Sequence, residues 1–264
     1  MIRKSILPLL IFSLLVLASC SKYQKLLKST DNDLKYEQAI KLYEKKDYYR
    51  ALQLFDQLNA FFKGTEKAER IAYYYAYCYY NQNDFLMGSY YFKRFATNYP
   101  KSPYAEECAY MAAYCNYEES PRSSLDQSST YDAIKELQLF INMYPTSEKV
   151  SKANTLIDEL RAKLEKKAYD IGMLYYKMYD YKAAIQTFKN VIKDFPDTPH
   201  REDLLYYILK SNYKYATNSI ATKRKERFTA TIESYDDLLS SYPKTIYLKE
   251  AHSMQKDAQN GILN

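Results

Sequence analysis

Small and large apolar residues recur among polar ones in a pattern that returns five times along the chain. Each set begins with a small residue, followed at +4 and +7 by large apolar residues. In the last four sets a proline preceded by an aromatic residue stands at +12. The sets begin at Ala51, Gly88, Ala133, Ala184 and Thr231. Spacings of 4 and 7 share one helical face, so the pattern predicts a repeated helical unit.

A second small residue lies upstream of each set, at a distance of twelve or twenty residues. The resulting pairs are Ala39/Ala51, Ala76/Gly88, Ala113/Ala133, Gly172/Ala184 and Ser211/Thr231. Because small residues let two helices approach closely, each unit is predicted to be a helix hairpin. The longer spacing predicts expanded loops at Glu118–Thr130 and at about Thr217–Lys225. Between the third and fourth units, Glu148–Met178 is predicted to form one long helix.

The turn between the paired helices has its own signature. Asp47-Tyr48, Asp84-Phe85 and Asp180-Tyr181, together with the small residues and closing prolines, resemble the tetratricopeptide repeat over residues 33 to about 250. Lys63 replaces the proline of the first unit, and Thr231 replaces the usual alanine of the last. The predicted fold class is therefore all-α, an α-solenoid of five tetratricopeptide-like helix hairpins. Such arrays usually bind partners rather than catalyse reactions.

The N-terminus predicts export and lipidation. Basic Arg3 and Lys4 precede an apolar stretch from Ile6 to Leu17, which is too short to span a bilayer. The tetrapeptide that ends at Cys20 resembles the bacterial lipobox, which implies a diacylglycerol thioether and an N-acyl chain on Cys20 after cleavage. An ordinary secretory signal with a chance cysteine is the alternative. Several acyl chains on one cysteine give stable anchoring.

Composition adds limits to this picture. The chain has 32 tyrosines, no tryptophan and a net charge of +6 with acids and bases interspersed, so charge alone does not indicate nucleic-acid binding. An odd number of cysteines besides Cys20 argues against a disulfide framework. Cys78, Cys108 and Cys115 are predicted to be buried free thiols, although a Cys78–Cys115 bridge is the alternative.

No catalytic or metal-binding constellation is recognisable in the sequence. His200 and His252 are far apart in the chain, and no glycine-rich phosphate loop or paired-cysteine spacing occurs. The pairs Glu106-Glu107 and Glu118-Glu119 are interpreted as solvated charges. We therefore expect no enzymatic activity, no metal and no cofactor other than the covalent lipid.

Two groups of residues are candidates for partner binding. Tyrosines recur at −3 and +4 from the small residue of the first helix in the first four units, and two of these helices also carry a tyrosine at +1. They predict an aromatic peptide groove, or only packing between neighbouring helices. The groove candidates are Tyr36, Tyr43, Tyr73, Tyr77, Tyr80, Tyr110, Tyr114 and Tyr117. The densest positive cluster is a candidate docking site for an acidic partner or lipid headgroups, or a solvated loop. Its residues are Lys223, Arg224, Lys225 and Arg227.

The chain as a whole resembles the BamD family of outer-membrane assembly lipoproteins. The resemblance rests on the lipobox, the short tether and the five hairpins, of which the third has an expanded loop. The segment Ser120–Gln127 is similar to an insertion of Bacteroidetes-type members. The resemblance implies a lipid-anchored subunit of the β-barrel assembly machine on the periplasmic face of the outer membrane. It also implies two partners, the POTRA domains of BamA and unfolded outer-membrane proteins. In the family the first repeats are associated with substrates and the last with BamA. A lipoprotein adaptor for peptidoglycan or cell-division proteins is the alternative function.

The predicted domain bounds follow from these assignments. They are a signal peptide at 1–19, a lipidated tether at 20–32, repeats 1–3 at 33–147, and the linking helix with repeats 4–5 at 148–264. Fully extended, the tether would reach roughly 40 Å and hold the repeats clear of the membrane.

Overall fold

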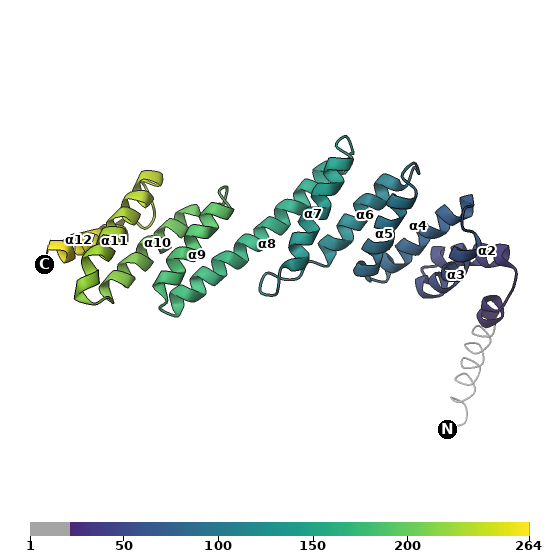
Figure 1. Cartoon of the computed structure of the whole chain (residues 1–264), viewed down its shortest axis with the longest axis horizontal. Coiled ribbons are helices and arrows are strands. Elements are labelled where there is room, and N and C mark those ends of the chain that lie inside the picture. Colours follow the sequence, from purple (N-terminus) through teal and green to yellow (C-terminus); the bar gives the residue numbers. More distant parts are fainter. Residues whose placement is uncertain (1–21, 264) are drawn as a thin grey trace, which may run out of the picture. The chain divides into compact units, whose positions relative to one another are not determined.

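A computed structural model describes residues 22–263, and the regular structure within that stretch is entirely helical (Figure 1). The all-α fold class is thus confirmed. Residues 22–27 are helical and precede the labelled helices. The labelled helices are α2 (Asn32–Glu44), α3 (Tyr48–Phe61), α4 (Glu66–Asn81), α5 (Phe85–Asn98), α6 (Ala105–Glu118), α7 (Ser128–Met143), α8 (Val150–Lys177), α9 (Tyr181–Asp194), α10 (Arg201–Thr217), α11 (Ala221–Ser241) and α12 (Leu248–Leu263).

The chain divides into two compact units. The first contains the described residues up to Pro121 together with Ser128–Ile157, and the second contains Arg122–Gln127 together with the chain from Asp158 onward. Hairpins α2–α3, α4–α5 and α6–α7 belong to the first unit. The second unit holds the later part of α8, which packs on α9, followed by α10, α11 and α12.

The repeating apolar pattern forms the cores of both units. All five small residues that begin the sets are buried, as are the large residues at +4 and +7. Phe55, Phe92 and Phe188, for example, are fully enclosed at the +4 positions. The small residues on the partner helices are also buried, which confirms the predicted helix pairing.

One turn design recurs in the first, second and fourth hairpins. Asp47, Asp84 and Asp180 each cap the second helix by accepting a hydrogen bond from the backbone N–H three residues on, at 3.4, 3.1 and 3.1 Å. The residues just before these aspartates adopt left-handed backbone conformations with φ of 60–65°: Lys46, Asn83 and Tyr179. The predicted Asp-aromatic signature therefore marks real turns.

The prolines end the second helices as their position predicts. The residue before a proline is forced out of the helical region, which stops the helix there. Tyr99, Phe195 and Tyr242 accordingly have φ near −130° and donate their N–H to the carbonyl four residues earlier. In the first hairpin, where Lys63 replaces proline, Gly64 at φ +83° follows the end of α3 instead.

Three features depart from the predicted elements. The long helix α8 is present but slightly shorter than predicted, with 28 residues. The predicted loop at Thr217–Lys225 is largely wrong, because α11 already begins at Ala221 and includes the basic cluster. A final helix, α12, extends beyond the predicted repeats and packs on α10 and α11 through Ala251, Met254 and Ala258.

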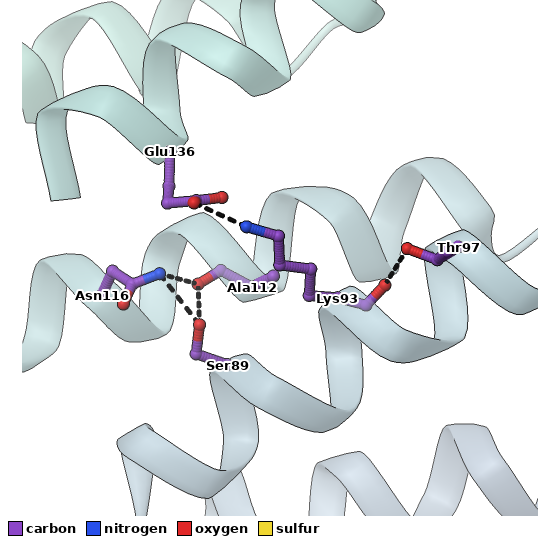
Figure 2. Close-up of polar contacts among 6 residues, drawn as sticks. All are labelled: Ser89, Lys93, Thr97, Ala112, Asn116 and Glu136. Atoms are coloured by element: carbon purple, nitrogen blue, oxygen red, sulfur yellow. Dashed lines mark hydrogen bonds and ion pairs between the residues drawn. The ribbon is translucent and has the colours of Figure 1, made fainter. Parts of the chain in front are cut away.

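Polar contacts join neighbouring helices of the first unit (Figure 2). On α5, the Ser89 hydroxyl donates to the Ala112 carbonyl of α6 at 3.0 Å, and it accepts from the Asn116 amide at 2.8 Å. The Lys93 ammonium of α5 reaches Glu136 of α7 at 2.6 Å. Because Ser89 is buried, its satisfied hydroxyl contributes to a single register between α5 and α6.

The segment expected to be a polar tether is partly ordered. The Tyr23 hydroxyl hydrogen-bonds to the Arg50 carbonyl at 2.9 Å and to the Gln53 amide oxygen at 2.8 Å. Leu26 and Leu27 pack against the core of the first hairpin. Residues 22–27 are therefore attached to α3 rather than extended into solvent.

Candidate partner-binding surfaces

The eight candidate groove tyrosines lie on the first helices of the first unit, and none of them is exposed. Tyr36 packs against Phe62 with ring centroids 6.1 Å apart, and Tyr77 packs against Phe92 at 4.8 Å. Tyr73 similarly contacts Phe95 at 6.2 Å. These tyrosines thus pack on the hairpin cores, in agreement with the packing interpretation.

A carboxylate organises two of these tyrosines. Glu107 of α6 accepts hydrogen bonds from the hydroxyls of Tyr73, at 3.0 Å, and Tyr77, both on α4. Burial, followed by the charge and hydrogen bond of Glu107, raises the pKa of Tyr73 and of Tyr77 above the usual range. The interpretation of Glu106 and Glu107 as solvated charges is therefore wrong, since Glu106 also accepts from the Ser147 hydroxyl at 2.6 Å.

A second group of tyrosines forms a more continuous aromatic surface. Tyr114 stacks on Tyr110 and on Tyr117, with centroids 6.1 and 5.8 Å apart, and lies 6.3 Å from Tyr80. All four rings are half-buried, so each keeps part of its surface accessible. We call Tyr80, Tyr110, Tyr114 and Tyr117 the tyrosine face. It joins α4 to α6 through contacts between partly accessible rings.

The second unit carries an exposed apolar surface that the sequence analysis missed. Spacings of 3 and 4 place three apolar residues on one face of α8, and the turn that follows adds two more. We call Ile171, Leu174, Tyr175, Met178 and Tyr179 the α8 stripe. Leu174, Met178 and Tyr179 are 54%, 64% and 78% exposed. Grouped apolar exposure of this kind is typical of interaction sites.

The signal for the α8 stripe was present in the sequence. The residues at −3, +1 and +4 from Gly172 on this helix are Tyr169, Met173 and Tyr176, and they pack against the α9 core. The remaining apolar residues of the same helical stretch therefore had to lie on another face. An α-helix that is apolar on two faces needs two partners, and α9 supplies only one of them.

The basic cluster lies in the first turns of α11, where a positive charge opposes the helix dipole. Two of its arginines are engaged locally. Arg224 donates to the Ser219 carbonyl at 2.9 Å, and Arg227 donates to the Ser219 hydroxyl and stacks 3.8 Å over the Tyr215 ring. Lys223 pairs with Glu226 at 3.3 Å, whereas Lys225 is exposed. The cluster thus closes the α10–α11 connection as well as carrying charge.

The described cysteines are buried. Cys78, Cys108 and Cys115 are free thiols, and burial raises the pKa of Cys78 and of Cys115 to about 12. Such thiols are poorly reactive. The predicted lipid-attachment residue, Cys20, lies outside the described residues.

Residues 22–263 hold no group of histidine, cysteine and acidic side chains arranged to bind a metal ion. His200 and His252 pack separately, against Tyr169 at 6.0 Å and Tyr235 at 5.6 Å. Within the same stretch, no helix has the length and apolarity needed to cross a membrane.

Successive helix hairpins with accessible aromatic and apolar surfaces define a helical-repeat scaffold of the tetratricopeptide type. The sequence model of one family, described as YfiO: Outer membrane lipoprotein, matches residues 28–227. The chain belongs to this family of outer-membrane lipoproteins. No curated protein sequence matches the chain.

Proposed function

We propose that the chain is a lipid-anchored scaffold subunit of the β-barrel assembly machine, equivalent to BamD in a Bacteroidetes-type bacterium. The observation that carries the proposal is the match of residues 28–227 to an outer-membrane lipoprotein family, over an array of helix hairpins. In this role the protein holds partners in place and performs no chemistry of its own.

The anchor in this proposal is Cys20, with a diacylglycerol thioether and an N-acyl chain. The residues before it, Leu17-Ala18-Ser19, fit a lipoprotein processing site. Anchored there, the repeats face the periplasm from the outer membrane. Metabolic labelling with a fatty acid tests the assignment: label incorporated into the wild type and absent from Cys20→Ser supports it, and equal labelling contradicts it.

We assign BamA docking to the second unit. The α8 stripe supports this assignment, because Leu174 and Met178 expose apolar side chains one helical turn apart. A folded periplasmic domain that covers them would bury surface that is otherwise unfavourable in water. Lys225, exposed in the first turns of α11, supplies a charged contact on the same unit.

We assign unfolded substrates to the tyrosine face of the first unit. Half-buried tyrosines offer apolar rings together with hydroxyl groups, which suits aromatic residues and backbone of an extended peptide. Since the rings stack on one another before any ligand arrives, little conformational entropy is lost on binding.

Depletion in the native bacterium tests this function against the adaptor alternative. Loss of folded barrel proteins from the outer membrane, with normal division, supports the assembly function. A septation or peptidoglycan defect with normal barrel levels contradicts it and supports the adaptor. Both readouts come from the same depleted culture.

A further inference from the structure

The first hairpin carries a hollow that the proposed docking surfaces leave unexplained. It measures about 630 Å³ and is bounded by residues 22–29, α2 and the start of α3. Residues 22–27 keep this hollow in place, because Tyr23 is hydrogen-bonded to α3 and Leu26 packs on the hairpin core. The hollow is therefore part of the folded unit.

Cations surround the hollow. Lys22, Lys25 and Lys45 line it and are exposed, and among residues 22–263 none of these three has an ion-pair partner. Arg50 also lines it but is paired with Asp47. Within the described part of the chain, no acidic side chain lines the hollow. Three uncompensated lysines around one hollow favour an anionic occupant.

Apolar side chains also line the hollow. Leu26, Leu34 and Leu42 contribute to its lining, and Leu34 is 42% exposed on α2. Lysines beside leucines in one hollow match the interface of a bilayer, where anionic headgroups adjoin acyl chains. A free inorganic anion would use the lysines and leave the leucines uncovered.

Only a short stretch of chain separates the hollow from Cys20. Lys22 is two residues from Cys20, so their Cα atoms lie within about 7 Å of each other even in a fully extended chain. A lipid attached to Cys20 therefore brings Lys22 to within about one Debye length of the headgroup layer at physiological salt.

We infer that this hollow is a docking site for anionic phospholipid headgroups of the membrane that holds Cys20. The inference rests on the proposed lipid anchor and adds an orientation to it. Lys22, Lys25 and Lys45 contact headgroup phosphates while Leu34 reaches the acyl boundary. The first hairpin then lies against the membrane, instead of being held clear of it by a tether.

The test uses the full lipidated chain reconstituted in vesicles. A fluorophore at Gln38→Cys, on a half-exposed position that lines the hollow, reports quenching by headgroup-labelled lipid. The buried thiols of Cys78, Cys108 and Cys115 leave the label specific. We expect strong quenching in vesicles with about 30% anionic lipid and weak quenching in neutral vesicles.

Lysine variants make the test specific. Replacing Lys22, Lys25 and Lys45 with glutamine weakens the membrane-contacting state about 100-fold, at about fivefold for each lysine. The matched control replaces three exposed lysines of α9, which removes the same charge and leaves quenching unchanged. The control residues are Lys182, Lys189 and Lys193. Circular dichroism verifies that both triple variants keep their helix content.

Three results would overturn the inference: equal quenching in neutral and anionic vesicles, no loss in the Lys22/Lys25/Lys45 variant, or an equal loss in the control. Vesicle flotation separates this failure from failure of the anchor. A chain that floats with the vesicles without quenching contradicts only the headgroup site. A chain that does not float contradicts the lipid anchor proposed for Cys20.

Discussion

At the scale of single residues, Tyr179 has two features that are unfavourable for the stability of the fold. Its side chain is 78% exposed, and its backbone is left-handed at φ 65°. Asparagine tolerates this conformation, and Asn83 occupies the equivalent place in the second hairpin. Lys46 shares this backbone conformation, but Tyr179 also exposes an apolar ring, which is more readily explained by binding than by folding.

We predict that Tyr179→Asn stabilises the protein by about 1 kcal/mol, because asparagine accepts the left-handed conformation more readily. The same change weakens BamA binding, because it removes part of the α8 stripe. Thermal unfolding and binding to purified BamA periplasmic domains are the two measurements. Lys46→Asn is the matched control, with the same backbone gain at φ 61° and no expected change in binding. Equal binding by the two variants would show that Tyr179 is not a contact.

Gly172 is required because a larger side chain would collide with a neighbouring residue, and its backbone conformation does not itself demand glycine. A Cβ atom there would lie 2.5 Å from the ring of Phe188, which is fully buried and cannot move aside. We predict that Gly172→Ala destabilises the protein by about 1–2 kcal/mol, since overpacking outweighs the gain in helix propensity. At Gly88 the nearest such contact is 3.2 Å, to the Cys115 sulfur. Gly88→Ala should therefore be close to neutral in urea unfolding, and an equal loss from both variants would refute this explanation.

At the scale of elements, α12 is attached to α10 by an aromatic and charged network. The Tyr206 ring stacks on Tyr247 with centroids 3.7 Å apart. The Tyr206 hydroxyl donates to Glu250 at 2.6 Å, and Lys210 pairs with the same carboxylate at 3.0 Å. The hydrogen bond from Tyr206, with a further contribution from Lys210, lowers the pKa of Glu250 below its ordinary value.

The Glu250 network predicts a pH dependence with a definite sign. A carboxyl group whose pKa is lower in the folded state stabilises the fold above its unfolded pKa, which is about 4.5. That contribution is lost as the pH falls from about 4.5 through the lower folded value. We expect the stability difference between wild type and Glu250→Gln to shrink over this range in urea unfolding. A difference that does not change with pH would contradict this account.

The tyrosine face predicts a separation between ligand binding and packing. Tyr114→Ala should weaken the binding of aromatic peptides from barrel proteins about tenfold, because one stacking platform is lost. Tyr77→Phe keeps the ring that packs on Phe92 and removes only the hydroxyl that donates to Glu107. It should therefore leave peptide affinity unchanged. Fluorescence titration measures both variants, and equal effects would favour packing as the sole role of these tyrosines.

Much of each hairpin could be predicted from the sequence, because small residues, +4 aromatics and prolines each have one local consequence. The proline after Tyr99 ends α5 whatever surrounds it. The helices α11 and α12 have weaker local signals, and their extents depend on tertiary contacts. The core face of α12 consists of Ala251, Met254 and Ala258 and lacks the large +4 residue that marks the second helix of each repeat. Basic residues at the start of α11 argue against a helix there.

The candidate surfaces were predicted less completely than the hairpins. Helical spacing placed the tyrosines on the first helices of the hairpins, but it could not show that Tyr73 and Tyr77 donate to Glu107 of the neighbouring hairpin. The α8 stripe was missed because apolar residues in a helix are first assigned to its core. Which of two apolar faces is covered depends on the partner helix α9, which sequence spacing alone does not position.

At the scale of the whole molecule, the proposed binding surfaces are divided between the two units. The first unit carries the tyrosine face and the hollow close to the predicted anchor, and the second carries the α8 stripe. Loss of one surface should leave the functions of the others intact, because each surface lies within a single compact unit.

The most direct test of the central claim is co-purification of BamA from native membranes after mild solubilisation. We predict that BamA accompanies the wild type and is lost with the double variant Leu174→Ser/Met178→Ser, which removes two exposed apolar residues one turn apart. The matched control, Leu86→Ser/Tyr90→Ser, makes the same kind of change on α5 of the first unit and should retain BamA. Absence of BamA from the wild-type preparation would contradict the account.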